Sequence, residues 1–334
     1  MRDLVAVSVI IPNLNGGEML LSCLAGLKQQ SLQDFEVILV DNGSSDGSPQ
    51  RAAQIYPGMT LLLLNANHGF AGACASAHDQ AKGEWIAVLN NDAVPEPGWL
   101  EEMYEAGISE DKVGMVASRV VQDRNPDLID SLGMLAGRNG LIYLIGHGDP
   151  VNAHPESPRF EHVFGPSAVA ALYSRRMLEE IGFFEPEFFA YYEDADLAFR
   201  ARWSGWNCLL ANRARVRHAH SATAEAIGLC KTYFLHKNLL RTVARNWPLL
   251  SFVKNFPYLI FYDILTTLAA VYAVSGLDAF RARFAFGAGL FADLRWRFEQ
   301  KPLRRVSPKD IDTWLSRGYP SALEVFQRRR NENR

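Results

Sequence analysis

The sequence predicts an α/β protein with a mainly parallel, doubly wound sheet and a helical C-terminal extension. Two observations support this. The first third of the chain alternates short apolar runs with segments of helical spacing, which is typical of parallel strands joined by helices. From Thr223 onward the pattern is helical, with no convincing strand. We therefore predict two regions, residues 1–225 and residues 226–334.

The predicted strands and helices follow a regular order. Continuous apolar runs indicate strands buried on both faces, and apolar residues three or four positions apart indicate helices. The first predicted elements are strand Val5–Ile11, helix Gly17–Gln30, strand Phe35–Val40, a helix ending near Ile55, strand Met59–Leu64, helix Phe70–Ala81 and strand Trp85–Leu89. The later ones are strand Val113–Val121, a loop-rich stretch over 122–162, strand Val163–Tyr173, helix Arg175–Ile181 and a helix at about Asp194–Ser204.

Polar clusters follow four of the predicted strands at the points where they end. They are Pro12-Asn13, Asp41-Asn42, residues 65–69 and Asn90-Asn91-Asp92. In a parallel sheet of this kind, the ligand binds beyond the carboxyl ends of the strands. The sequence therefore predicts a ligand site at this edge of the sheet.

Asp92 is a candidate ligand for a hard cation. It directly follows a buried strand, so its carboxylate can leave the sheet edge and bind Mg²⁺ or Mn²⁺ together with the phosphates of a substrate. The simpler interpretation is that an aspartate at a strand end only forms a turn.

A second acidic cluster contains Glu193, Asp194 and Asp196, directly after an aromatic run that ends at Tyr192. Acidic residues favour a helix N-terminus, so at least one member is expected to serve only the helix, and Asp196 is the expected structural member. Aromatic neighbours can place another carboxylate in a partly dry pocket, where a raised pKa suits it to act as a general base.

His218 and His220 close the segment 214–220. Two histidines at positions i and i+2 of a strand share one face. Either could be a structural histidine, but imidazole beside an oxygen-rich shell also suits Mn²⁺. We therefore consider that this pair contains a candidate metal ligand.

Five motifs occur in an order that resembles the family 2 glycosyltransferases. They are residues Val7–Asn15, Val40–Ser48, Asn67–Gly72, Leu89–Asp92 and Tyr192–Leu197, and the similarity covers roughly residues 5–220. The run Gly182–Phe189 and the distal histidine are most similar to the bacterial rhamnosyltransferase-like branch. The resemblance implies a GT-A fold, a nucleotide-diphosphate sugar donor and a divalent metal, Mn²⁺ or Mg²⁺.

The resemblance also implies roles for individual residues. Asp194 matches the catalytic base, and Asp92 and His218 match the metal ligands. Asn90 stands at the first position of the Asp-x-Asp motif, so metal binding would rest on Asp92 and His218. Glu193, Asp196 and Tyr192 are assigned to acceptor-binding or supporting roles. The residues assigned to nucleotide-sugar binding are Pro12, Asn13, Asn15, Asp41, Asn67, Gly69, Asn91 and Asp92.

The implied reaction is an inverting transfer of a hexose. The branch favours L-rhamnose from dTDP-rhamnose as the donor sugar, and a lipid-linked or polysaccharide acceptor of the bacterial envelope. Two alternatives stay open: a nucleotidyltransferase, and a non-catalytic nucleotide-sugar-binding membrane adaptor on the same fold. The first is disfavoured because the loop after strand one, residues 12–17, contains no Lys or Arg. A dehydrogenase would need Gly-x-Gly-x-x-Gly after a strand, which is not found.

The charge distribution predicts a membrane partner for the C-terminal region. Residues 1–225 contain 16 Lys and Arg against 29 Asp and Glu, a balance of −13, whereas residues 226–334 contain 18 against 8, a balance of +10. The apolar stretch Tyr258–Val274 reaches only the lower limit for a membrane span. We predict peripheral contact with an anionic membrane, with a helical hairpin packed on the first region as the alternative. No nucleic-acid-binding motif accompanies the basic residues.

Other features predict the compartment. The four cysteines are scattered without a CxxC pair, which indicates a reducing environment. The apolar run near the N-terminus carries Asp3 and is interpreted as a strand, not a signal peptide. We predict a cytoplasmic protein at the cytoplasmic face of the inner membrane. No sequence feature specifies an oligomeric state.

Overall fold

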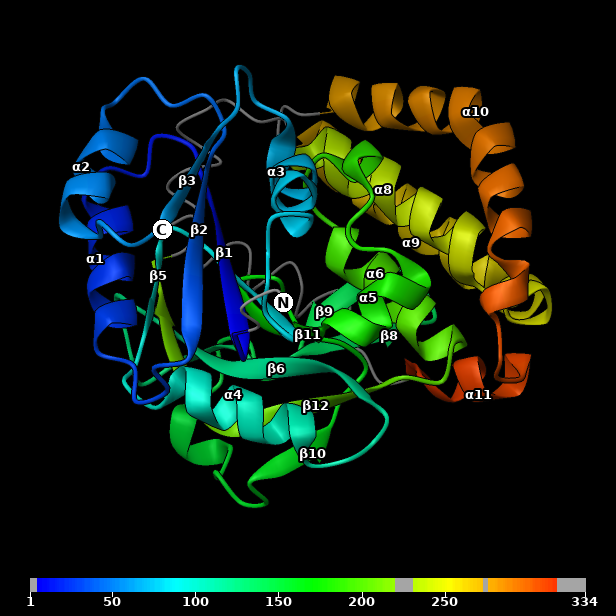
Figure 1. The fold of residues 1–334 in the computed structure, drawn as a ribbon. Coiled ribbons are helices and arrows are strands. Elements are labelled where there is room, and N and C mark those ends of the chain that lie inside the picture. Colours follow the sequence, from blue (N-terminus) through cyan, green and yellow to red (C-terminus); the bar gives the residue numbers. More distant parts are fainter. Residues whose placement is uncertain (1–4, 220–230, 273–275, 317–334) are drawn as a thin grey trace.

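The computed structural model describes residues 5–219, 231–272 and 276–316. Its centre is a mixed sheet with the strand order β10-β12-β6-β11-β4-β1-β2-β3, and β5 and β7 pair with β12 and β6 (Figure 1). The strands of this sheet are β1 (Val7–Asn13), β2 (Phe35–Asp41), β3 (Thr60–Leu63), β4 (Trp85–Leu89), β5 (Ala93–Pro95), β6 (Val113–Gln122), β7 (Ile129–Ser131), β10 (Phe160–His162), β11 (Ala170–Ser174) and β12 (Asn207–His218).

The predicted parallel core of the sheet is confirmed. β1 pairs in parallel with β2 and β4, β2 pairs in parallel with β3, and β12 pairs in parallel with β6. β11 differs, because it lies between β4 and β6 and is antiparallel to both. The sheet is therefore mixed at the point where its two parallel parts meet.

Helices cover both faces of the sheet. They are α1 (Gly17–Lys28), α2 (Ser48–Ile55), α3 (Gly69–His78), α4 (Trp99–Ile108), α5 (Arg175–Ile181) and α6 (Glu193–Trp203). Alternating strand residues point to opposite faces, so Ile10 packs in the core with α3 and α6, while Val9 packs in the core with α1 and α4. This arrangement leaves the carboxyl ends of the parallel strands open at one edge.

The segment between β6 and α5 contains more structure than the sequence predicted. The stretch 122–162, predicted as loop-rich, includes β7, β8 (Met134–Gly137), β9 (Ile142–Leu144), the short 3₁₀ helix η1 (Val151–Ala153) and β10. The predicted strand Val163–Tyr173 is wrong in its first half, because β11 begins only at Ala170. Ser167, Ala168 and Val169 instead line a cavity, as described below.

The C-terminal region is helical in its described parts. It contains α8 (Lys231–Asn246), α9 (Leu249–Tyr272), α10 (Gly276–Glu299), η3 (Lys301–Leu303) and α11 (Pro308–Thr313), while η2 (Pro186–Phe188) precedes α6. Helices α8–α10 lie together to the right of the sheet in Figure 1. A two-residue strand, β13 (Leu315–Ser316), was not predicted and pairs with β8 in a second sheet of order β13-β8-β9.

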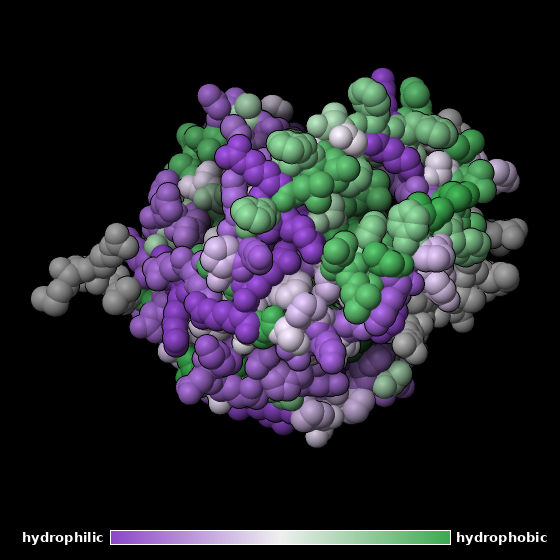
Figure 2. Space-filling view, turned by 90° about the vertical axis from the view of Figure 1, so that its right-hand side faces the viewer, coloured by the Kyte–Doolittle hydropathy of each residue, from purple (hydrophilic) through white to green (hydrophobic). Residues whose placement is uncertain are grey.

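Helices α9 and α10 expose an unusual amount of apolar surface. Of the 21 large hydrophobic side chains that are exposed in the described part of the chain, 18 lie on these two helices, and the other three are Ile55, Leu63 and Ile108. Apolar residues gather in the upper right of the face shown in Figure 2, which views the molecule from the side of α8–α10. Among the described residues, no helix is long and apolar enough to cross a membrane.

Candidate active site

A cavity of about 460 Å³ lies at the edge of the sheet where the parallel strands end. The polar strand ends identified in the sequence meet there. Residues 189–195 and helix α8 close its other side, with Lys231 and Leu235 from α8 in the wall. The predicted site residues in the wall are Pro12, Asn13, Asn67, Gly69, Asn91, Asp92, Tyr192, Glu193, Asp194 and His218.

Asn13 connects three of the strand ends. Its side chain is buried, and its amide nitrogen donates to Ser44 Oγ at 3.1 Å and to Ser48 Oγ at 3.2 Å. Its amide oxygen accepts a bond of 2.8 Å from Asn91 Nδ2. These bonds fix the loops after β1, β2 and β4 relative to one another, so the floor of the cavity is preorganised.

Two predicted nucleotide-binding residues are not part of the cavity wall. Both carboxylate oxygens of Asp41 accept bonds of 3.3 Å from the Ser44 backbone N–H, so this side chain caps its own turn. Asn15 has a φ of 52°, and its side-chain oxygen accepts a bond of 2.8 Å from the Ser45 N–H. In this structure, both residues support the loops beside the cavity.

Asn42 was not among the predicted site residues but lines the cavity. Its amide nitrogen donates to Asn67 Oδ1 at 3.0 Å and to the Gly69 carbonyl at 3.1 Å. Gly69 has a φ of +73°, and a Cβ at this position would clash with the backbone of Phe189. A glycine is therefore required where the loop over the cavity meets residues 186–192.

Asp92 and His218 lie next to each other in the cavity wall. His218 Nε2 is 3.3 Å from Asp92 Oδ1, and His218 Nδ1 is 2.8 Å from Asp130 Oδ2. All three side chains are buried. Burial acts to lower the pKa of His218, but its hydrogen bonds to Asp130 and Asp92 outweigh this effect and raise the pKa to about 9. His220 lies outside the described residues.

Asp130 was not predicted, although it lines the cavity and orients His218. It lies on β7, within the stretch predicted to be loop-rich, and follows β6 only after a turn. A carboxylate directly after two apolar residues, Leu128 and Ile129, was the available signal in the sequence. Within the described residues, no group of three or more His, Cys, Asp or Glu side chains is arranged to hold a metal ion by itself.

Glu193 and Asp194 begin helix α6 in the opposite part of the wall. Asp194 accepts hydrogen bonds from the backbone N–H of Ala168 at 3.1 Å and of Ala195 at 2.8 Å. Burial raises the pKa of Asp194 despite these bonds. Burial, followed by the neighbouring charge of Asp194, raises the pKa of Glu193 well above its usual range.

Asp196 lies outside the cavity wall. It is fully buried, and its carboxylate accepts bonds from Arg200 Nε at 2.8 Å and from Asn246 Nδ2 at 2.7 Å. Side chains at positions i and i+2 of a helix point in widely different directions, so those of Asp194 and Asp196 lie on different sides of α6. The geometry agrees with the structural interpretation of Asp196.

The segment before Glu193 has an unusual backbone. Phe189, Tyr191 and Tyr192 have φ values of 64°, 67° and 71°, although none of them is glycine. Such conformations are costly for bulky residues and persist only where the surrounding structure holds them. The segment also contributes Phe189, Ala190, Tyr191 and Tyr192 to the cavity wall.

Two solved structures share this architecture. The structure of GalNAc-T7 with UDP, GalNAc and Mn²⁺ superposes with a TM-score of 0.59 and 15% identity, over 75% of this chain and 49% of that chain. The mannosyltransferase PcManGT from Pyrobaculum calidifontis, in complex with GDP-Man and Mn²⁺, superposes with a TM-score of 0.52 and 19% identity, over 90% of this chain and 85% of that chain. The fold is the GT-A fold of glycosyltransferases.

The sequence places the chain more narrowly. The model of glycosyl transferase family 2 matches residues 8–182, just over half of the chain, so the chain belongs to this family. An N-acetylglucosaminyl-diphospho-decaprenol L-rhamnosyltransferase of Mycobacterium tuberculosis (strain ATCC 25618 / H37Rv) is 28% identical over 235 residues, which are 64% of this chain and 76% of the relative. A glycosyltransferase of Haloferax volcanii, AglE, is 35% identical over 100 residues, 28% of this chain and 33% of the relative. Glycosyl transfer is the activity that the family and fold support.

Proposed function

We propose that this chain is an inverting glycosyltransferase that uses a nucleotide-diphosphate sugar, with Asp194 as the general base. The observation that carries the proposal is the position of Asp194. Its half-buried carboxylate lies in the wall of the same cavity as Asp92 and His218, at the polar ends of the parallel strands. Burial raises the pKa of Asp194, which makes its carboxylate a better proton acceptor than an exposed aspartate.

In this reaction, the Asp194 carboxylate removes the proton from an acceptor hydroxyl. The hydroxyl oxygen forms a bond to the anomeric carbon from the face opposite the leaving group. The bond between that carbon and the diphosphate breaks, and its electron pair leaves with the diphosphate. The backbone N–H groups of Ala168 and Ala195 hold the carboxylate in place during this step. General base catalysis of this kind contributes typically about 10²–10⁴-fold to the rate.

The residues at the other end of the cavity suit a divalent metal. Asp92 supplies a carboxylate oxygen and His218 an imidazole, and the bond from His218 Nδ1 to Asp130 orients the ring so that Nε2 faces Asp92. Two protein ligands completed by substrate phosphates are typical of Mg²⁺ and Mn²⁺ sites. A bound metal would neutralise charge on the leaving diphosphate.

The test of the proposed base is Asp194→Asn. This variant should bind nucleotide-diphosphate sugar as the wild type does but lose about 10²–10⁴-fold in turnover. Asp149→Asn, at a partly exposed aspartate bonded to His154, is the matched control and should keep full activity. Full turnover by D194N would remove Asp194 from this role.

We further propose dTDP-L-rhamnose as the donor and a lipid-linked or polysaccharide hydroxyl as the acceptor. The mycobacterial relative, named as a rhamnosyltransferase acting on N-acetylglucosaminyl-diphospho-decaprenol, supports both assignments. Thermal melting with dTDP- and UDP-sugars, with and without Mn²⁺, tests the donor, because a ligand that binds only the folded state raises its stability. A shift with another sugar alone would overturn the rhamnose assignment, and binding without turnover would favour a non-catalytic adaptor.

The outer faces of α9 and α10 support a membrane partner, and we propose that they contact an anionic bilayer at the cytoplasmic face of the inner membrane. The polarity of α9 is partly inverted relative to a helix on the surface of a water-soluble protein, because two of its four buried residues are polar. Ser251 and Asn255 are buried, whereas Phe261 and Leu268 are about 60% exposed. Polar residues that face the protein and apolar residues that face outward are typical of a lipid-contacting helix.

Some charged groups of α9 and α10 turn inward, whereas Arg281 and Arg295 on α10 are exposed. Arg283 on α10 pairs with Asp263 on α9 at 2.5 Å, and Asp293 is buried on the inner side of α10. Phe284 and Phe291 on α10 are each 82% exposed. The +10 balance of residues 226–334 favours anionic lipids as the surface that these apolar side chains enter.

Co-sedimentation with phosphatidylglycerol/phosphatidylcholine vesicles tests this surface. The double variant Phe284→Glu/Phe291→Glu should bind at least about tenfold more weakly than the wild type, because each substitution removes an apolar anchor worth about 1.5–3 kcal/mol when buried. Leu63→Glu/Ile108→Glu, at exposed apolar residues far from these helices in sequence, should leave binding unchanged. A wild-type dimer that dissociates in the α10 variant without any vesicle binding would assign the surface to a second copy of the chain.

A further inference from the structure

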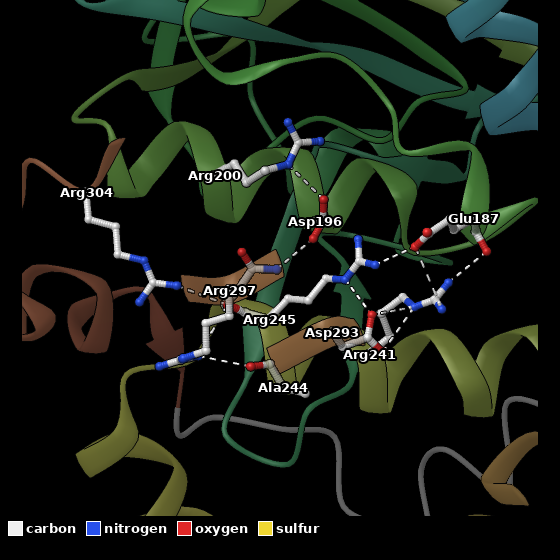
Figure 3. A network of polar contacts seen from close by, with 10 residues as sticks. Glu187, Asp196, Arg200, Arg241, Ala244, Arg245, Asp293, Arg297 and Arg304 are labelled. Atoms are coloured by element: carbon white, nitrogen blue, oxygen red, sulfur yellow. Dashed lines mark hydrogen bonds and ion pairs between the residues drawn. The ribbon is translucent and has the colours of Figure 1, made fainter. Parts of the chain in front are cut away.

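One face of α8 is polar and lies against the segment that leads to Asp194. Its residues Asn238, Arg241, Arg245 and Asn246 are spaced so that they share one side of the helix. Arg241 and Arg245 both reach Glu187 in the segment before α6 (Figure 3). Asn246 reaches Asp196 within α6. The helix thus makes polar contacts on both sides of Asp194 in the sequence.

Asn238 makes the densest set of these contacts. Its side-chain nitrogen lies 2.8 Å from the Phe188 carbonyl oxygen, 2.9 Å from that of Ala190 and 2.8 Å from that of Tyr191. Only the NH₂ end of the amide can donate, and its two hydrogens are shared among the three carbonyls, so the orientation of the amide is set by the backbone that it meets. Asn238 is fully buried, and its Oδ1 has no hydrogen-bond partner among the described residues.

A buried amide oxygen without a partner is costly, because it loses its bonds to water. The hydrogen-bond donors of asparagine, and not its packing, therefore explain this residue at position 238. The three carbonyls belong to the segment in which Phe189, Tyr191 and Tyr192 have positive φ angles. Bulky residues hold such conformations only where surrounding contacts enforce them.

Charged contacts hold the start of the same segment. Arg245 Nη2 lies 2.5 Å from Glu187 Oε2, and Arg241 Nη1 donates to the Glu187 carbonyl at 2.8 Å. Asp293 of α10 orients both arginines, at 2.7 Å from Arg245 Nε and 3.1 Å from Arg241 Nε. As Figure 3 shows, both guanidinium groups lie between Asp293 and Glu187.

We propose that the polar face of α8, through Asn238, Arg241 and Arg245, holds residues 187–192 in their observed backbone conformation and thereby positions Asp194. Asn238 is the central positioning residue. The inference rests on the proposed role of Asp194 as the general base. Asn238 is absent from the residues that line the cavity, so it acts through the backbone that it binds. Helix α8 then serves catalysis itself, apart from any membrane contact of α9 and α10.

The test compares Asn238→Leu with Asn255→Leu. Leucine has a shape similar to asparagine but no donor. Asn255 is a matched buried asparagine whose amide, within the described part of the chain, bonds only to Ser251 O of α9, at 2.7 Å. N238L should lower kcat about 10–100-fold, as expected when a catalytic group is misplaced by roughly 1 Å. Its dissociation constant for the nucleotide-diphosphate sugar should change less than threefold. Hydrogen exchange of residues 189–195 should become faster in N238L only.

The outcomes separate this inference from the proposed function. A wild type without transferase activity would contradict the proposed function. An active wild type with N238L and N255L equal in kcat would overturn the positioning role. If N238L does not fold, the variant Glu187→Gln tests the proposal instead. The side chain of Glu187 is 59% exposed, so its substitution leaves no buried cavity. Glu187→Gln should lower kcat severalfold with unchanged donor binding, and an unchanged kcat would overturn the proposal.

Discussion

Asn246 on α8 donates a hydrogen bond of 2.7 Å to Asp196 on α6, across 50 residues of sequence. The second carboxylate oxygen of Asp196 accepts from Arg200 at 2.8 Å. Asp196 therefore joins two helices inside the protein, although it lies only two residues from Asp194 in the cavity wall. The acidic cluster at the start of α6 thus divides into a buried structural carboxylate and two that face the cavity.

Asp196→Ala should destabilise the protein without changing the chemistry of the cavity. It leaves Arg200 buried without its carboxylate partner, a change that typically costs about 3–5 kcal/mol. Urea unfolding should show this loss, while the kcat of the folded fraction stays within about twofold of the wild type. The milder substitution Asn246→Ala should lower the free energy of unfolding by about 1–3 kcal/mol, because it removes one hydrogen bond to a charged group. Wild-type stability in D196A would contradict the structural role.

Glu193→Gln should change the pH dependence of stability. Burial raises the pKa of Glu193 above its ordinary value of 4.5, so the folded state holds the proton more tightly than the unfolded state. The contribution of Glu193 to stability is therefore fully present below pH 4.5 and is lost as pH rises through the raised folded-state pKa. Glutamine does not titrate. The Tm of E193Q should therefore rise relative to the wild-type Tm as the pH is increased from 4.5 to 8.

Glu161→Gln, at an exposed glutamate on β10, is the control for this experiment. Its Tm should follow the wild type at every pH. A Tm difference between E193Q and the wild type that stays constant over this pH range would show that Glu193 titrates alike in the folded and unfolded states.

His218→Ala and Asp92→Asn should each weaken the binding of Mn²⁺. His218→Ala removes one ligand and Asp92→Asn removes the charge of the other, so each should raise the Mn²⁺ dissociation constant at least about tenfold. Calorimetry with a nucleoside diphosphate present measures this constant. His154→Ala, at a partly exposed histidine bonded to Asp149, should leave the constant unchanged. Removal of the metal with EDTA should lower donor affinity in the wild type. Equal Mn²⁺ binding by all four proteins would place the metal elsewhere.

The sequence predicted the parallel part of the sheet well because each strand there is short, apolar and bounded by polar turns. β4 and α5 match their predicted bounds, and β1 and β2 differ only at their ends. The antiparallel insertion of β11 and the short strands β7, β8 and β9 could not be predicted. Their pairing depends on contacts with strands far away in the chain, and no local pattern encodes the direction in which a strand pairs.

Some residues of the candidate site could be predicted from the sequence, and others could not. Asp92 was found from its residue type at a strand end, whereas Asp194 and His218 were singled out by the family resemblance. The structure brings all three to one cavity. Asp41 and Asn15 were assigned by motif position, yet their side chains bond to neighbouring loops outside the wall. Asp130 and Asn238 carry no motif, so only their partners in space indicate what they do.

By itself, the sequence determined the fold class, the family and the residue types of the site. These depend on apolar periodicity and on side-chain chemistry, which are properties of short stretches of chain. Only the tertiary structure decided that Asp130 orients His218, and that α8 holds the backbone before Asp194 through Asn238. Such contacts join residues 47 to 88 positions apart, and they form only when packing brings distant segments within hydrogen-bond distance.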